Sequence, residues 1–127
     1  KNIVTHGYQK DLDNFYSRSK FVINPVFNGV GVKVKTVEAL AKGSILITSN
    51  NGVEGIRGNI NDIAYVCYDD QEWIKKLLYL LSINNHEMLR KKVIIWSNKF
   101  LNRSYIFNDL YNWIKGCKDS REKIGLS

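Results

Sequence analysis

The sequence predicts an α/β fold with a parallel sheet, and three observations carry this prediction. Short apolar runs such as "FVIN" and "SILITS" lack the alternation of polar and apolar residues, which is typical of strands buried on both faces. Segments with apolar residues at helical spacing separate these runs. Loops rich in glycine and asparagine, such as "NNGVEGIRGNIND", stand between them. We therefore expect a Rossmann-like parallel sheet of about three or four strands, with flanking helices and right-handed crossovers.

Each expected element has a local signal at one of its ends. Gly7 ends the first apolar run, and Pro25 stops the second. Gly43 is a suitable residue to terminate a helix, and Asp69 or Asp70 can cap the start of the next long one. In chain order, the expected elements are a strand at 2–6, a helix within 10–19, a strand at 21–25, a helix at 33–43, strands at 44–49 and 63–68, and helices at 70–83, 86–102 and 105–117.

Length, composition and charge bound the class of protein. The chain has 127 residues, of which 44% are hydrophobic, and this suits one domain over residues 1–127 with a real core. The net charge is +7, with eight basic and four acidic residues in 1–60 and eleven and eight in 61–127. This even spread favours a general attraction to phosphate. No nucleic-acid-binding signature accompanies it, so nucleic acid is not an expected partner.

Cysteine and histidine usage gives no sign of a metal site or of disulfides. Cys67, Cys117, His6 and His86 show no metal-type spacing, so no metal is expected. Two free thiols are typical of a reducing compartment, which predicts a cytoplasmic location. No run approaches the length of a membrane span. The chain begins without methionine inside an expected strand, which suggests a piece of a longer protein.

The loop before the helix at 33–43 carries the candidate chemistry. Gly29 and Gly31 allow backbone N–H groups to approach an anion closely. Lys33 and Lys35 stand near the start of the helix, where cations are unfavourable unless an anion compensates them. Glu38 follows one turn later, where a carboxylate can accept both hydroxyls of a ribose. The loop thus predicts a nucleotide site, and the alternative is a purely structural connection between strand and helix.

The residues from Asn24 to Ile56 resemble the donor-binding region of the group 1 glycosyltransferases of GT-B fold. The residues that carry the resemblance are Pro25, Gly29, Gly31, Lys35, Glu38, Ala39, Ala41, Gly43, Thr48, Gly52, Glu54 and Gly55. The similarity extends over about residues 2–110. It implies that the chain is part of the C-terminal, donor-binding half of such an enzyme, with retention of anomeric configuration and no metal or other cofactor.

The resemblance also implies roles for individual residues. Glu38 would hold the ribose hydroxyls, and Lys35 would face the diphosphate with help from Lys33. The full set of expected donor contacts is Tyr8, near the base, with Gly29, Val30, Gly31, Lys33, Lys35, Glu38, Gly52 and Glu54. Val30 stands where many family members have a first glutamate, and Glu54 could equally brace its own loop.

These implications predict a transferase with no catalytic residue in this chain. It would transfer a hexose-type sugar from a nucleotide sugar to a glycan or lipid-linked acceptor, which the missing N-terminal half would bind. The isolated chain would be inactive. The alternative is a non-catalytic Rossmann-like module that binds a nucleotide or a protein.

Three expectations concern packing and partners. The resemblance implies that the strand next to the expected strand at 2–6 is missing, and the sheet edge exposed in this way predicts a homodimer or a loosely attached first segment. The basic, aromatic helices at 86–117 are either solvated faces or a peripheral contact with an anionic membrane on its cytoplasmic side. Trp73, Trp96 and Trp113, spaced with Leu and Ile, are expected to pack in the core or between helices.

Overall fold

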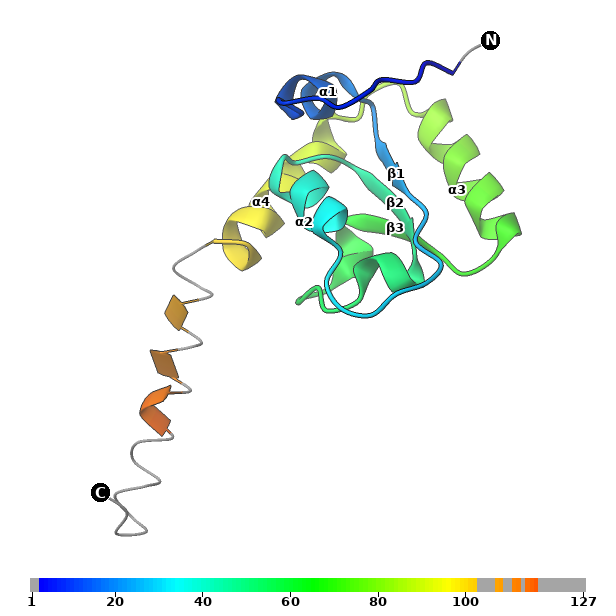
Figure 1. Cartoon of the computed structure of the whole chain (residues 1–127). Helices are drawn as coiled ribbons and strands as arrows, with labels where there is room; N and C mark the ends of the chain where they lie inside the picture. The colour runs from blue at the N-terminus through cyan, green and yellow to red at the C-terminus, as the bar shows by residue number, and fades with distance from the viewer. Residues whose placement is uncertain (1–2, 103–106, 109–110, 113, 117–127) are drawn as a thin grey trace, which may run out of the picture.

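The computed structural model describes residues 3–102, 107–108, 111–112 and 114–116. Its sheet has three parallel strands in the order β1-β2-β3, with helices on both faces (Figure 1). The Rossmann-like α/β prediction is therefore confirmed. The strands are β1 (Val22–Asn24), β2 (Leu46–Ser49) and β3 (Ala64–Cys67), the helices are α1 (Asp13–Arg18), α2 (Val34–Ala41), α3 (Asp70–Ser82) and α4 (Glu87–Phe100), and two 3-10 turns are η1 (Asn50–Val53) and η2 (Ile60–Asp62).

The two faces of the central strand build the two halves of the core. All four residues of β2 are buried. Leu46 packs with Leu40 of α2 and Val93 and Trp96 of α4 in one cluster. On the opposite face, the second cluster contains Ile45 and Ile47, Cys67 of β3, and Leu80 of α3. A strand covered on both faces has no polar side to show, which explains its unbroken apolar run.

The expected strand at 2–6 is wrong over residues 3–6, and Asn2 lies outside the described residues. Residues 3–9 contain no regular secondary structure, and Ile3 and Val4 are 87% and 73% exposed. A strand needs a neighbour for its backbone N–H and C=O groups, and none of the strands in the described sheet pairs with this segment. The apolar residues alone could not show that no strand of the described sheet pairs with this segment.

The predicted helices match the structure at most positions. Asp69 caps α3 as expected, because its Oδ1 accepts a hydrogen bond from the Glu72 amide at 2.8 Å. Trp96 is buried and Trp73 packs against the second core cluster, which confirms both as packing residues. In the helix expected at 105–117, residues 107–108, 111–112 and 114–116 are helical. Trp113 and Cys117 lie outside the described residues.

Candidate functional site

Two loops meet at the carboxyl ends of β1 and β2, which is the edge where ligands bind in open parallel sheets. The first spans residues 25–33 and leads into α2, and the second spans 50–55 (Figure 1). The Asn51 side-chain amide donates to the Phe27 carbonyl at 2.8 Å. The Ser49 hydroxyl accepts from the Val26 amide at 3.1 Å and donates to the Val26 carbonyl. The first loop is thus held in place by the side chains of Ser49, the last residue of β2, and of Asn51 in the second loop.

A buried chain of polar groups lies beneath the two loops. Asn24 Nδ2 donates to Thr36 Oγ1 at 3.1 Å, and Thr36 Oγ1 donates to the Gly52 carbonyl at 2.6 Å. The Thr48 hydroxyl donates to the Asn24 carbonyl at 2.6 Å. Thr36 and Thr48 are fully buried. Because buried polar groups are costly unless paired, this network fixes the start of α2 relative to the second loop.

The first loop closes around the carboxylate of Glu54 from the second. Glu54 Oε2 accepts a hydrogen bond from the Gly31 amide at 2.9 Å and lies 3.3 Å from Lys33 Nζ. The same ammonium group donates to the carbonyls of Gly29 at 3.1 Å and Gly31 at 2.5 Å. Gly29 and Gly31 have φ angles of 105° and 85°, a region that favours glycine. Lys33 is therefore engaged within the loop itself, and Glu54 is its counter-ion.

The start of α2 offers free donors next to this loop. Its N-cap residue, Lys33, makes no side-chain cap. The Lys33 carbonyl accepts from the amides of Thr36 and Val37 at 3.0 and 3.1 Å. Within the described part of the chain, the amides of Val34 and Lys35 have no hydrogen-bond partner. Lys35 itself is exposed in the first turn, so its charge and the two amides are open to an anion.

Glu38 lies one turn further along α2, and its carboxylate has a partner that the sequence did not indicate. The Tyr16 hydroxyl of α1 donates to Glu38 Oε2 at 3.1 Å. Burial of the phenol, together with the hydrogen bond and the charge of Glu38, raises the pKa of Tyr16 to about 12. Tyr16 thus remains a neutral donor at ordinary pH. In the sequence it was one of several apolar residues at helical spacing, and nothing there links it to a residue 22 positions later.

The structure brings most of the predicted donor contacts together, with one exception. The two loops and the first turn of α2 hold Gly29, Val30, Gly31, Lys33, Lys35, Gly52 and Glu54, with Glu38 on the next turn. Val30 is 94% exposed, next in the chain to Gly31, whose amide binds the Glu54 carboxylate. Tyr8 is 93% exposed in the segment before α1, which Figure 1 shows at the other end of the sheet, where β1 begins. The structure therefore does not bring Tyr8 to the rest.

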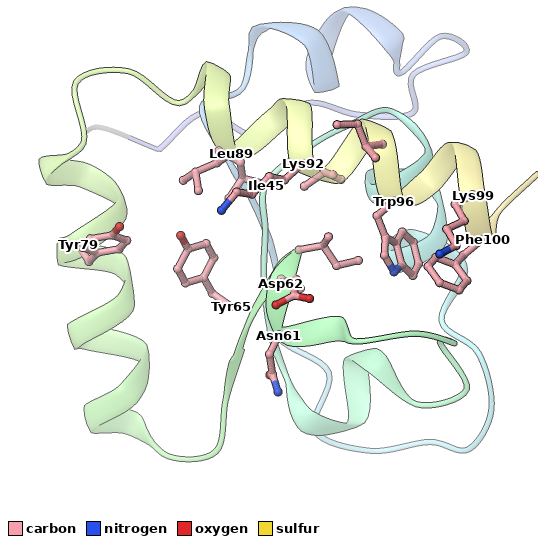
Figure 2. Close-up of a pocket in the computed structure, with 14 residues that line it drawn as sticks. Ile45, Asn61, Asp62, Tyr65, Tyr79, Leu89, Lys92, Trp96, Lys99 and Phe100 are labelled. Atoms are coloured by element: carbon pink, nitrogen blue, oxygen red, sulfur yellow. The ribbon is translucent and has the colours of Figure 1, made fainter.

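Two of the hollows in the described part of the chain differ in their chemistry. A polar cavity of about 310 Å³ between the loops is lined by Gly29, Asn50, Asn51, Val53 and Glu54. A second, of about 680 Å³, lies beside β3 between α3 and α4, with Tyr65 and Tyr79 on one side and Trp96 and Phe100 on the other (Figure 2). None of the predicted donor contacts lines the second hollow.

Two searches of the described residues bear on metals and membranes. No group of three or more His, Cys, Asp or Glu side chains in this part of the chain is arranged to hold a metal ion. None of the helices described is long and apolar enough to cross a lipid bilayer.

Comparisons with known proteins identify the family of this chain. A protein of Klebsiella pneumoniae named "Uncharacterized 44.6 kDa protein in cps region" is 26% identical over 77 residues, which are 61% of this chain and 20% of that protein. The match therefore spans about a fifth of the relative's length. No solved structure matches the chain. The family described as "Glycosyl transferases group 1" matches residues 1–83, which include both loops and α2. This match covers well over half of the 127 residues, so the chain belongs to the group 1 glycosyltransferase family.

Proposed function

We propose that the chain binds the nucleoside diphosphate part of a nucleotide-sugar donor at the start of α2, beside the two loops. The observation that carries the proposal is the pair of unpartnered amides, Val34 and Lys35, next to the exposed Lys35 ammonium group. The partial positive charge of a helix N-terminus and a lysine together favour a phosphate group. Membership of a glycosyltransferase family supports a nucleotide as the source of that phosphate.

In this proposal Glu38 binds the ribose. Its side chain is half-buried one turn beyond the amides, and Tyr16 fixes one of its two carboxylate oxygens. The other oxygen, Oε1, has no hydrogen-bond partner in the described residues and can accept a ribose hydroxyl. A carboxylate held in this way costs less ordering when the ligand binds, because one of its contacts is already made.

The chain contributes to transfer by stabilising the leaving group. As the bond between sugar and β-phosphate breaks, negative charge grows on the phosphate, and the fixed amides and Lys35 stabilise that charge. No catalytic base is assigned to this chain. The sugar goes to a glycan or lipid-linked acceptor on the cytoplasmic side, and the acceptor is bound by residues outside residues 1–127. On its own, the chain binds donor without transferring sugar.

Calorimetric titration of the chain with UDP and with GDP at low salt tests this proposal. Lys35→Ala removes the proposed phosphate contact, and Glu38→Gln removes the negative charge of the proposed ribose acceptor. We expect each to weaken binding roughly tenfold, the effect of one charge-assisted hydrogen bond. Lys75→Ala on α3 and Glu87→Gln on α4 are the matched controls, since both side chains are exposed and lie on other helices. Equal affinity in all five proteins would disprove the site.

A further inference from the structure

Only one of the two oxygens of the Glu54 carboxylate has partners in the described residues. Its Oε2 is bound by the Gly31 amide at 2.9 Å and lies 3.3 Å from Lys33 Nζ. Its Oε1 has no hydrogen-bond partner in the described part of the chain. The Lys33 side chain is 14% exposed and the Glu54 side chain is 47% exposed. Glu54 is therefore anchored on its protein side and open on its solvent side.

The anchored carboxylate changes what the glycine loop can bind. The Gly31 amide and the Lys33 ammonium group already hold an anion, so a phosphate at this point would meet the negative charge of Glu54. Like charges at hydrogen-bond distance repel strongly where water is partly excluded. A phosphate is favoured instead at the amides of Val34 and Lys35, which are unpartnered in the described residues. In a nucleotide sugar, the sugar is attached to this phosphate. The sugar then lies toward Glu54.

The cavity in front of Glu54 has the chemistry of a site for hydroxyl groups. Asn50 and Asn51 line its walls, and its volume of about 310 Å³ lies at the lower end of the range for small-molecule sites. Asn51 is fixed by its bond to the Phe27 carbonyl at 2.8 Å. A carboxylate oxygen accepts hydrogen bonds only, while an amide side chain both donates and accepts. This combination suits a polyhydroxylated ring and disfavours a second anion.

We propose that Glu54 is a specificity-determining residue that accepts hydrogen bonds from hydroxyl groups of the donor's sugar in the cavity between the two loops. The inference rests on the proposed function, because it needs a nucleotide sugar bound through its diphosphate at α2. In this proposal Glu54 contacts the ligand in addition to holding the loop through Gly31 and Lys33. Glu54 distinguishes a nucleotide sugar from the nucleoside diphosphate that remains after transfer, which lacks the hydroxyls.

The test compares each free nucleoside diphosphate with its sugar-bearing form. UDP, UDP-glucose, UDP-galactose, UDP-N-acetylglucosamine, GDP and GDP-mannose are titrated into the wild-type chain, Glu54→Gln and Glu87→Gln, with dissociation constants from calorimetry. Gln keeps an oxygen for the Gly31 amide but turns a donor toward the cavity. Amide NMR spectra of the free variants, read at Gly29 and Gly31, report whether the loop keeps its structure. Glu87→Gln makes the same charge change on an exposed position of α4.

We expect at least one nucleotide sugar to bind the wild-type chain roughly five- to tenfold more tightly than its free diphosphate, the effect of one hydrogen bond to a charged group. In Glu54→Gln this advantage should fall to about onefold, while affinity for the free diphosphate stays within about twofold. Glu87→Gln should keep the wild-type ratio.

Five other results overturn the inference, and they can be told apart. If the wild-type chain binds no nucleoside diphosphate, the proposed function itself fails. If it binds sugar-bearing and free forms equally, or if Glu54→Gln keeps the advantage, the cavity does not select the sugar. If Glu54→Gln binds every ligand more tightly by one common factor, Glu54 competes with phosphate. If all affinities fall together and the Gly29 and Gly31 signals shift, Glu54 is a structural brace.

Discussion

The Tyr16 hydroxyl donates a hydrogen bond to Glu38 Oε2 at 3.1 Å and so joins α1 to α2. A second contact joins the same helices, because Lys42 Nζ lies 2.6 Å from Asp13 Oδ1. That ion pair is exposed on both sides and contributes little to stability. The Tyr16 contact is partly buried, so it is the one that orients the Glu38 carboxylate.

Replacing Tyr16 with Phe should affect ligand binding and stability to different degrees. The change removes one partly buried hydrogen bond to a carboxylate and should lower the free energy of unfolding by about 1 kcal/mol. It should also weaken binding of a nucleoside diphosphate by roughly threefold, less than Glu38→Gln, because Tyr16 positions the acceptor without touching the ligand. Urea unfolding and calorimetry measure the two effects. Tyr111→Phe, at a 64% exposed position, is the control and should change neither. A Tyr16→Phe variant with unchanged stability would show that the hydrogen bond is not formed in solution.

The raised pKa of Tyr16 predicts how stability changes in alkaline solution. Burial and the neighbouring Glu38 raise the pKa of Tyr16 to about 12 in the folded chain, against about 10 in an unfolded one. The folded state thus holds this proton more tightly than the unfolded state does. The resulting stabilisation is fully present below about pH 10 and is lost as the pH rises toward 12.

Unfolding by urea at a series of pH values between 8 and about 11.5 measures this loss. The free energy of unfolding of the wild-type chain should fall more steeply above about pH 10 than that of Tyr16→Phe, which lacks the phenol. The ultraviolet absorbance of phenolate should show one tyrosine fewer titrating near pH 12 in the variant. Parallel pH curves for the two proteins would show that Tyr16 has an ordinary pKa.

Gly52 should tolerate no side chain, although its backbone is not in the left-handed region. A Cβ added at Gly52 would lie 1.9 Å from Thr48 Oγ1 and 3.2 Å from Thr48 Cβ. Thr48 is fully buried and bonded to the Asn24 carbonyl, so it cannot move aside without breaking that bond. Gly52→Ala should therefore cost about 3 kcal/mol of unfolding free energy. Gly7→Ala is the control, since a Cβ there meets nothing within 4 Å. Equal melting temperatures for the two variants would contradict the packing described for the second loop.

The sequence was sufficient to predict those strands and helices whose signal lies in neighbouring residues. The apolar runs predicted β1, β2 and β3, and helical spacing with a cap at Asp69 predicted α3. The spacing of apolar residues and the residues that end an element depend only on neighbours in the sequence. The prediction failed for residues 3–6, because whether an apolar run forms a strand depends on a partner strand. The location of the candidate site could also be predicted from the sequence, since parallel strands bring their carboxyl ends to one edge of the sheet.

The contacts inside the site could not be predicted in the same way. The bond from Gly31 to Glu54 joins residues 23 positions apart, and the bond from Tyr16 to Glu38 joins residues 22 apart. Each depends on how two loops or two helices pack after folding, which no local pattern encodes. The two lysines at the start of α2 predicted a bound anion, and for Lys33 the structure shows the carboxylate of Glu54, from the chain itself, at 3.3 Å.

The buried hydroxyl of Thr36 gives the last prediction, because it connects the start of α2 to the end of β1 and to the second loop. It accepts from Asn24 Nδ2 at 3.1 Å and donates to the Gly52 carbonyl at 2.6 Å. Thr36→Val keeps the shape of the side chain but leaves both partners buried and unpaired, which should cost about 2–3 kcal/mol. Thr36→Ser keeps the hydroxyl and loses only a methyl group, which should cost about 1 kcal/mol. Thermal melts should therefore rank wild type above Ser and Ser above Val, with roughly 3–5 °C for each kcal/mol. If Val were more stable than Ser, packing of the methyl group rather than the polar network would hold α2 in place, and the anion-binding amides would not depend on Asn24 and Gly52.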